Sequence, residues 1–456
     1  MKELLLISGL GVLSLLSGLL NLRKGFLLIV ILGLLGNIGL SIADWNLNED
    51  VYGMMLMDNF ALAFNIVMSV SAILWFISAS SYFNNDNNFS DHFSLVLFSM
   101  CGGLVLLSYS NMSMLFLGIE ILSIPLFVLV GSDKTKLSSN EAAFKYFLLG
   151  AFATAFLLFG IALIYGATGS FQNSVIASKL SEGNINALAF TGMLLMLVAM
   201  AFKVSAAPFH FWAPDVYQGA PSYITAFMAT VVKTVAFAAF YRLFNTTFAS
   251  MQTEYKIVFA AIAALTLIIA NFTAAVQTNV KRLLAYSSIA HAGFMMITLL
   301  CMANNTSGIL LYYVLVYSIS SIAAFSIFEI VRTQSNGKED IDAFKGLIRR
   351  NRWLAGVFAF AMLSMSGIPP LAGFMAKYMI FTAAIDNGYM WLALIGIAGS
   401  LIAVYYYFKV IIAMFGHESE EAPISISASQ KIILVLCALG LIALSIFPNL
   451  VINQLS

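Results

Sequence analysis

The stretch that decides the fold runs from Met200 to Phe240 and reads MAFKVSAAPFHFWAPDVYQGAPSYITAFMATVVKTVAFAAF. Its two apolar arms each carry one lysine, Lys203 and Lys233, and prolines and a histidine separate the arms. A charged side chain at the centre of a membrane helix costs roughly 2.5–3.5 kcal/mol. Lysines in such positions therefore need a partner, water or a function.

The composition of the whole chain is that of a membrane protein. Of its 456 residues, 61% are hydrophobic and 9% are charged, whereas globular domains contain about 25% charged residues. The formal net charge of +1 argues against a nucleic-acid partner. Cys101, Cys301 and Cys437 lie far apart in apolar runs without a C-x-x-C motif, so we interpret them as packing residues.

Apolar segments long enough to cross a bilayer recur along the chain. We predict an all-α polytopic membrane protein with about fourteen transmembrane helices. Glu3 offsets Lys2 and no A-x-A-like cleavage site follows, so the first segment is predicted to be a helix rather than a signal peptide. The expected spans are residues 4–21, 26–43, 59–81, 92–109, 112–131, 142–168, 185–207, 221–244, 256–276, 283–301, 307–331, 353–383, 388–415 and 430–450.

Lysines and arginines in the loops predict the orientation, because cytoplasmic loops carry an excess of them. With the N-terminus outside, the acidic loop ADWNLNEDVYG also lies outside, where the loops hold little basic charge beyond Lys179. An even number of helices then places both termini on the outer, periplasmic side. The basic residues expected inside are Arg23, Lys24, Lys134, Lys136, Lys281, Arg282, Arg332, Lys338, Lys345, Arg349, Arg350 and Arg352.

The sequence predicts no cofactor site in this chain. Its longest polar connections span about 20 residues, which is too short for a folded domain outside the membrane. No glycine-rich nucleotide loop follows a strand. We therefore expect neither NADH, ATP, flavin nor a metal to bind here.

Two of the predicted helices contain breaks. Prolines follow Lys203 in SAAPFHFWAP, and the segment SMSGIPPLAGFMAK places Pro369 and Pro370 between two glycines. Proline removes a helical donor and clashes with the preceding turn. Irregular backbone at membrane depth is tolerated only inside protein or beside a water-filled cavity. Breaks five helices apart predict two related, inverted halves, as in many secondary transporters.

Six ionisable residues within the predicted helices are candidates for a function, and several alternatives are open for them. Lys145 could be a simple i,i+4 partner of Glu141, and the histidine could be a packing residue. Glu329 is expected to pair with Arg332 or to face the cytoplasm. Charges near helix ends, at Lys281, Arg282 and Lys409, are interpreted as reaching the headgroups. The six candidates are Glu120, Lys145, Lys203, Lys233, His291 and Lys377.

Proton relay is the functional hypothesis for these residues. Burial disfavours the charged form of a lysine, and a nearby carboxylate favours it. A carboxylate that approaches or leaves Lys203, such as Glu120, would load or unload its proton. Lys233 and Lys377 would be successive stations, with His291 and water between them. The pattern does not by itself establish that Glu120 meets Lys203.

Several motifs resemble those of the antiporter-like membrane subunits of respiratory complex I. FKVSAAPFHFWAPDVYQGAPSYITAFMATVVK resembles their signature, and its D-V-Y-Q-G-A-P ending is similar to that of subunit N, the homologue of mitochondrial subunit 2. EAAFKYFLLGAFATAFLLFGIALIYGATGS, NVKRLLAYSSIAHAGF and SGIPPLAGFMAK support the same family. The resemblance covers roughly residues 90–415.

The resemblance implies a fold and a set of sites. The family has fourteen helices, with inverted five-helix repeats formed by helices 4–8 and 9–13 and with discontinuous helices 7 and 12. Here the implied division is 1–90, a three-helix segment; 91–245 and 246–416, the two repeats; and 417–456, a loop and helix 14. The family's glutamate of helix 5 falls on Glu120, and its lysines of helices 6, 7, 8 and 12 fall on Lys145, Lys203, Lys233 and Lys377; its histidine of helix 10 falls on His291.

The function implied by resemblance is that of a proton-translocating module in an NADH–quinone oxidoreductase of a bacterial inner membrane. FMN, iron–sulfur clusters and quinone would belong to partner subunits, and other membrane subunits, including sister antiporter-like subunits, would be its neighbours. One alternative is a subunit of a cation/proton antiporter or a membrane-bound hydrogenase. A second is a structural scaffold whose buried charges are inert.

Overall fold

A computed structural model of the chain describes residues 1–19, 25–83, 88–183, 186–301, 305–416 and 422–455. The predicted helix ends at 20–21 and 185 and the basic residues Arg23 and Lys24 lie outside the described residues.

Helices make up most of the described chain. They are α1 (Lys2–Leu19), α2 (Phe26–Ala43), α3 (Asn59–Phe83), α4 (Phe89–Ser108), α5 (Met112–Val130), α6 (Leu137–Thr168), α7 (Asn173–Ser181), α8 (Ala187–Lys203), α9 (Trp212–Gly219), α10 (Ser222–Phe227), the π-helix η1 (Met228–Val232), α11 (Lys233–Arg242), η2 (Leu243–Thr247), η3 (Ala249–Met251), α12 (Gln252–Ala275), α13 (Val280–Leu300), α14 (Thr306–Gln334), η4 (Ile341–Phe344), α15 (Leu347–Arg350), α16 (Arg352–Ser366), α17 (Ala372–Asp386), α18 (Met390–Gly416), α19 (Ala428–Ile446), α20 (Asn449–Ile452) and η5 (Asn453–Leu455).

The predicted all-α membrane fold is confirmed. Eleven helices of the described chain are long and apolar enough to cross a membrane, and the shorter helices α8 and α16 are also apolar. The very short junction expected near residues 109–112 is present, since α4 ends at Ser108 and α5 begins at Met112. One addition to the expectation is a small antiparallel hairpin, in which β1 (Glu49–Val51), within the acidic loop, pairs with β2 (Met55–Met57), directly after it.

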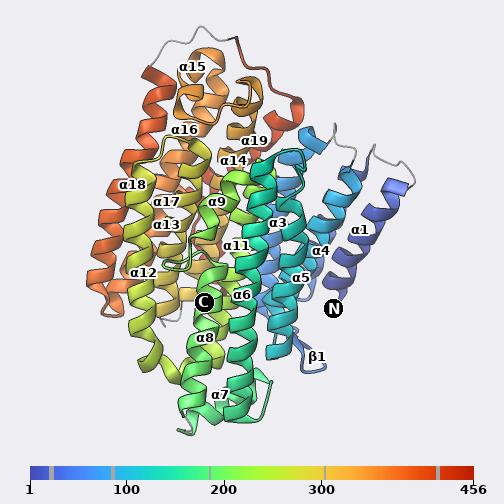
Figure 1. The fold of residues 1–456 in the computed structure, drawn as a ribbon, viewed down its shortest axis with the longest axis vertical. Helices are drawn as coiled ribbons and strands as arrows, with labels where there is room; N and C mark the ends of the chain where they lie inside the picture. Colours follow the sequence, from blue (N-terminus) through green and yellow to red (C-terminus); the bar gives the residue numbers. More distant parts are fainter. Residues whose placement is uncertain (20–24, 84–87, 184–185, 302–304, 417–421, 456) are drawn as a thin grey trace.

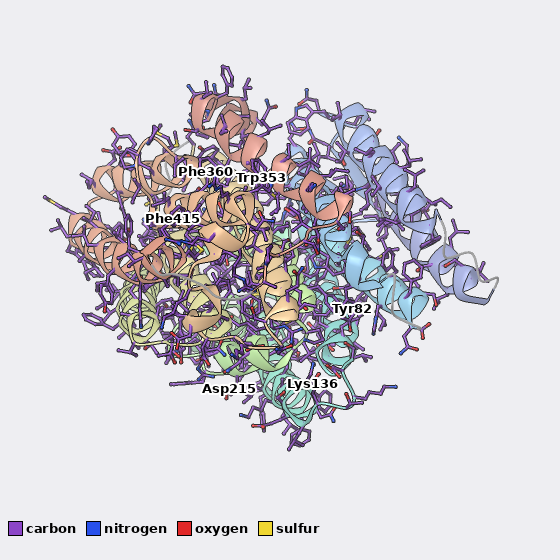
Figure 2. All side chains as sticks on the ribbon, turned by 90° about the horizontal axis from the view of Figure 1, so that it is seen from above. Tyr82, Lys136, Asp215, Trp353, Phe360 and Phe415 are labelled. Carbon is purple, nitrogen blue, oxygen red and sulfur yellow. The ribbon has the colours of Figure 1, made fainter. Side chains whose placement is uncertain are left out.

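The helices form a bundle with two different ends (Figure 1). The short helix α15, which carries Arg349 and Arg350, lies at one end, and β1 and α7 lie towards the other. Figure 2 views the bundle along the line between these two ends, and Lys136 and Asp215 lie on the same side of the molecule. The end with α15 is called the basic end below, and the end with β1 the hairpin end.

Both predicted helix breaks are present. α8 ends at Lys203, α9 begins only at Trp212, and Ser205 between them has a φ of 61°. α16 ends at Ser366 and is followed by Gly367, whose φ of 86° is in the left-handed region that favours glycine. The gaps expose helix-end carbonyls at membrane depth, and these must find donors.

Helices α4 and α5 pack at backbone distance through Gly102. A Cβ added at Gly102 would lie 2.7 Å from the carbonyl carbon of Ile121 and 2.9 Å from the carbonyl oxygen of Gly118. Small residues allow such close contacts between membrane helices. Because α5 carries Glu120 and Ser123, this contact also fixes the position of the first site.

Gly102→Leu should therefore destabilise the bundle. Overpacking typically costs about 1–3 kcal/mol, and here the obstacle is backbone that cannot rotate away. We expect a lower thermal unfolding midpoint for the detergent-purified protein. Gly39→Leu in α2, where an added Cβ meets nothing within 4 Å, is the matched control. Equal midpoints for the two variants would contradict this account of the contact.

Candidate functional site

The first group of site residues lies between α5, α6 and α8. The ammonium of Lys203 donates a hydrogen bond to Ser123 Oγ at 2.5 Å. Glu120 lies one helical turn before Ser123 and accepts a hydrogen bond from Thr154 Oγ1 at 2.7 Å. Among the ion pairs of the described residues, none joins Glu120 to Lys203. The structure thus brings the two residues to one site, with a serine hydroxyl holding the ammonium.

A small cavity adjoins this site. Its walls include Ser123 of α5, Tyr146 and Thr154 of α6, and Lys203 at the end of α8. The ring of Tyr146 stacks on Trp212, the first residue of α9, with ring centroids 4.8 Å apart. The broken helix therefore contacts the wall of the Lys203 cavity through an aromatic pair.

The second group of site residues gathers around α13. Lys233 is 3% exposed and donates to the backbone oxygen of Ser288 at 2.7 Å and to its hydroxyl at 2.5 Å. Its ammonium also lies 5.8 Å from the centre of the Tyr317 ring. The π-helix η1 ends directly before Lys233, and π-helical segments within α-helices are frequent at functional sites.

His291 lies about one turn after Ser288 in α13 and is surrounded by tyrosines. Its Nδ1 is 2.7 Å from the hydroxyl of Tyr313, and its Nε2 is 3.5 Å from that of Tyr407. The Tyr317 ring, which faces Lys233, is 4.7 Å from the imidazole, centre to centre. Lys233 and His291 therefore share one aromatic neighbour.

Lys377 belongs to the same region. It is 4% exposed, and it donates at 2.9 Å to the carbonyl oxygen of Ser366, the last residue of α16. Its ammonium lies 4.6 Å from the centre of the Phe294 ring, which also packs against His291. Lys377 thus satisfies an exposed helix-end carbonyl at the second break, where a cation is also favoured by the helix dipole.

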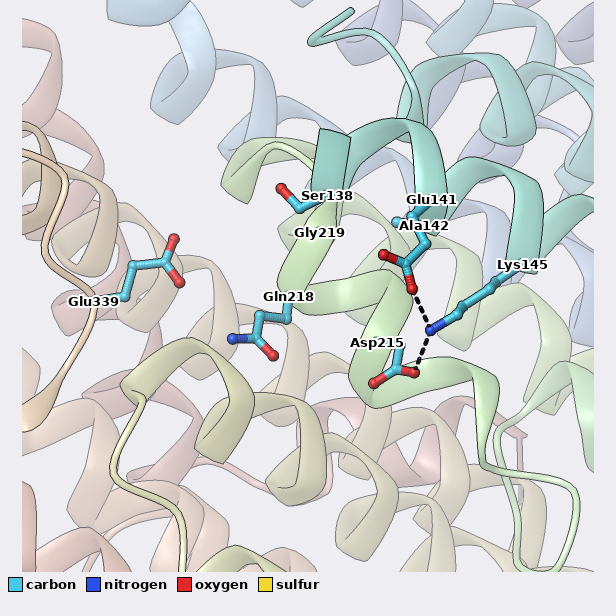
Figure 3. A pocket seen from close by; sticks show the side chains of 8 residues that line it. All are labelled: Ser138, Glu141, Ala142, Lys145, Asp215, Gln218, Gly219 and Glu339. Atoms are coloured by element: carbon cyan, nitrogen blue, oxygen red, sulfur yellow. Dashed lines mark hydrogen bonds and ion pairs between the residues drawn. The ribbon is translucent and has the colours of Figure 1, made fainter. Parts of the chain in front are cut away.

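Lys145 lies apart from both groups, in a polar cavity of about 360 Å³ near the basic end. Figure 3 shows its ammonium between two carboxylates, Glu141 at 2.7 Å and Asp215 at 2.9 Å. Its side chain is 40% exposed. The i,i+4 pair with Glu141, one of the alternatives raised by the sequence, is present. Lys145 is nevertheless the sequence neighbour of Tyr146, which lines the Lys203 cavity.

Asp215 forms ion pairs with both Lys145 and Arg282 and so connects this polar cluster. Burial raises the pKa of its carboxyl, but hydrogen bonds from Lys145 and Arg282 outweigh burial and hold the pKa below its ordinary value. Arg282 donates to Asp215 at 2.9 Å and to the Gln218 side chain at 2.8 Å. The cluster joins α6, α9 and α13 by charge.

The interpretation of Lys281 as reaching the headgroups is wrong. Lys281 is 3% exposed, and its ammonium donates to the backbone oxygens of Gln218 at 3.0 Å and Ala220 at 2.5 Å. Its position near a helix end suggested the membrane surface, but α9 provides carbonyls that attract it inward. The expected pair of Glu329 with Arg332 is present, at 2.7 Å.

Sequence reasoning missed the neutral groups that hold the charges. Ser123 and Ser288 contact the lysines, and Tyr313, Tyr317 and Tyr407 surround the histidine. One signal was available, since Tyr313 and Tyr317 are spaced i,i+4 and share a helix face. No group of three or more metal-ligating side chains occurs within the described residues.

Comparison with known proteins gives consistent matches. Residues 110–403 match the transmembrane family described as NADH:quinone oxidoreductase/Mrp antiporter. A protein of Cytophaga hutchinsonii named NADH-quinone oxidoreductase subunit N is 43% identical, with 99% of each chain covered. A chain of respiratory complex I from Thermus thermophilus superposes with a TM-score of 0.85 at 32% identity, covering 99% of this chain and 98% of that one. A chain of the Mrp complex from Dietzia has a TM-score of 0.86 at 18% identity, covering 100% and 96%, and shows a shared fold.

The Asp215 cluster predicts a pH-dependent contribution to stability. Because the pKa of Asp215 is lowered in the folded protein, its contribution is present above the unfolded value of about 3.9 and is lost as pH falls through the lowered value. The side chain is 38% exposed, so the contribution is about 1 kcal/mol or less. Asp215→Asn should lower the thermal midpoint at pH 7. At pH values below the lowered pKa of Asp215, it should leave the midpoint unchanged.

The control for this measurement is Glu182→Gln, which changes an exposed carboxylate at the end of α7. Its midpoint should follow that of the unchanged protein at every pH. A difference for Asp215→Asn that persists undiminished in acid would mean that the ion pairs are not its cause.

Proposed function

This chain belongs to the subunit N family of NADH-quinone oxidoreductase, and from that premise we propose that it moves protons across the membrane through its buried lysines. The energy for this transfer comes from electron transfer between NADH and quinone in other subunits. In this proposal Glu120, Lys145, Lys203, Lys233, His291 and Lys377 carry the relay.

The observation that carries the proposal is the way three of the relay lysines are held. Lys203, Lys233 and Lys377 contact serine hydroxyls, backbone carbonyls and aromatic rings. Within the described residues, none of the three forms an ion pair. An inert scaffold would neutralise such charges, since an unpaired buried charge is costly. Neutral partners leave each lysine able to gain or lose a proton without breaking an ion pair.

The contacts suggest an order for the stations. Lys145 and the polar cavity at the basic end collect protons, and Tyr146, the sequence neighbour of Lys145, lines the Lys203 cavity. On the far side, Lys233, His291 and Lys377 follow one another along α13 through Tyr317 and Phe294. No hydrogen bond of the described residues joins Lys203 to Lys233, and the proposal assigns that step to bridging water. Glu120 sets the charge beside Lys203.

The surroundings of the chain follow from the same proposal. The basic end faces the cytoplasm, both termini face the periplasm of a bacterial inner membrane, and residues 91–245 and 246–416 form the two inverted repeats. Other membrane subunits, including sister antiporter-like subunits, lie beside it in the bilayer. FMN, iron–sulfur clusters and quinone are held by partner subunits. A cation/proton antiporter or a hydrogenase subunit is the second candidate; the family description, which also names Mrp antiporters, and the shared fold of the Mrp chain favour the antiporter.

Removing a relay lysine should uncouple pumping from electron transfer. In inside-out membrane vesicles, Lys203→Ala and Lys233→Met should each lower the NADH-driven proton uptake rate by roughly tenfold, or ~1.4 kcal/mol in barrier. The measurement is quenching of a pH-sensitive dye, with NADH-dehydrogenase activity on native gels as the check of assembly.

Lys345→Met is the matched control, because Lys345 is a half-exposed lysine paired with Asp342 at the basic end. It should pump at the unchanged rate. Full pumping by an assembled Lys203→Ala variant would favour the scaffold alternative over the relay.

Purification of the tagged chain from its own membranes in mild detergent tests the named complex. We expect NADH:quinone activity in the eluate, together with peripheral subunits that carry flavin and iron–sulfur clusters by mass spectrometry. Antiporter or hydrogenase subunits without NADH oxidation would instead support the second candidate.

A further inference from the structure

Lys281, at the start of α13, binds the C-terminal end of the short helix α9. Lys281 donates to the backbone oxygens of Gln218 and Ala220 and is itself almost wholly buried. Carbonyls at a helix C-terminus lack intrahelical donors and carry partial negative charge. The ammonium therefore satisfies two groups that the break in the helix leaves exposed.

Arg282, the next residue of α13, binds side chains of the same helix. Arg282 binds the carboxylate of Asp215 and the side-chain oxygen of Gln218. One residue of α13 thus holds the backbone of α9, and the next holds its side chains. Together Lys281 and Arg282 are called the α9 clamp below.

The clamp also joins two parts of the relay that are distant in the sequence. α9 follows the break after Lys203, whereas α13 carries Ser288, which holds Lys233. Lys281 and Ser288 are seven residues apart, which is about 10 Å and two turns along the same face of one helix. A shift of the start of α13 would therefore also move Ser288.

α9 also contacts α6 closely at both of its ends. A Cβ added at Gly219 would lie 2.6 Å from the Cβ of Ala142 in α6. At its start, Trp212 stacks on Tyr146 in the wall of the Lys203 cavity. α9 therefore lies between the Lys203 cavity and the clamp, with contacts to both.

We propose that Lys281 and Arg282 are positioning residues that couple the two halves of the relay, by transmitting the position of α9 through α13 to the Ser288 contact of Lys233. The inference rests on the proposed function, since it assigns the clamp a role in that relay. Neither residue is a proton station in this account. They set the geometry between Ser288 and Lys233 when the broken helix moves.

The test compares assembled complexes in inside-out vesicles. Lys281→Met removes the ammonium but keeps a long apolar side chain, and Arg282→Met is a second clamp variant at a part-exposed position. The measured quantity is protons taken up per NADH oxidised, as a function of pH. We expect Lys281→Met to lower this ratio by about threefold or more, as for residues in direct contact, and to shift its pH profile. Arg282→Met should show a smaller fall.

Lys179→Met is the matched control. Lys179 also donates to a helix-end carbonyl, that of Thr168 in α6, but it lies in α7 at the hairpin end, away from the relay. Its loss should leave the ratio and its pH profile unchanged. If Lys281 and Lys179 were only structural, Lys281→Met and Lys179→Met would both affect assembly. Neither variant would then shift the pH profile.

The double variant Lys281→Met/Ser288→Ala decides whether the clamp acts through Ser288. We expect a ratio no lower than that of the worse single variant, because both changes interrupt one connection. Effects that multiply, or an unchanged ratio in Lys281→Met, would overturn the proposal. If Lys281→Met does not assemble, Arg282→Met takes its place in the same cycle, and an unchanged ratio there would overturn it equally.

Failure of the clamp and failure of the relay give different results. Pumping that survives Lys233→Met would refute the relay itself, and the clamp with it. Pumping that is lost in Lys233→Met but unaffected by either clamp variant would leave the relay standing and refute only the coupling through α13.

Discussion

The structure depends on how single ammonium groups are accommodated inside apolar helices. Each such charge costs about 2.5–3.5 kcal/mol at a helix centre by insertion scales, so a chain that is 61% hydrophobic retains few of them. Here Lys203, Lys233 and Lys377 are held by hydroxyls, carbonyls and aromatic faces. These groups stabilise the charge without neutralising it, and the proposed relay depends on this.

The helix breaks supply part of that accommodation. A broken helix leaves carbonyls without donors, and a lysine nearby satisfies them while the helix dipole favours its charge. Lys377 does this at the end of α16, and Lys281 does it at the end of α9. Two costs that would each destabilise a membrane helix, an exposed carbonyl and a buried cation, thereby offset one another.

Several ion pairs lie instead near the basic end. Lys145, Asp215 and Arg282 form a part-exposed cluster beside the polar cavity. Water screens such charges, so they stabilise the fold little. Their main effect is on geometry, because they join α6, α9 and α13.

The sequence by itself determined the membrane class, the spans and both breaks, because hydrophobic length and proline chemistry are local properties. The span predicted for 26–43 coincides with α2, and the breaks after Lys203 and Ser366 were visible as Pro/Gly clusters. Only the tertiary structure decided which groups meet. Ser288 and Lys233 are 55 residues apart, and the inward course of Lys281 depends on carbonyls of another helix. Such contacts arise from helix packing, which no local pattern encodes.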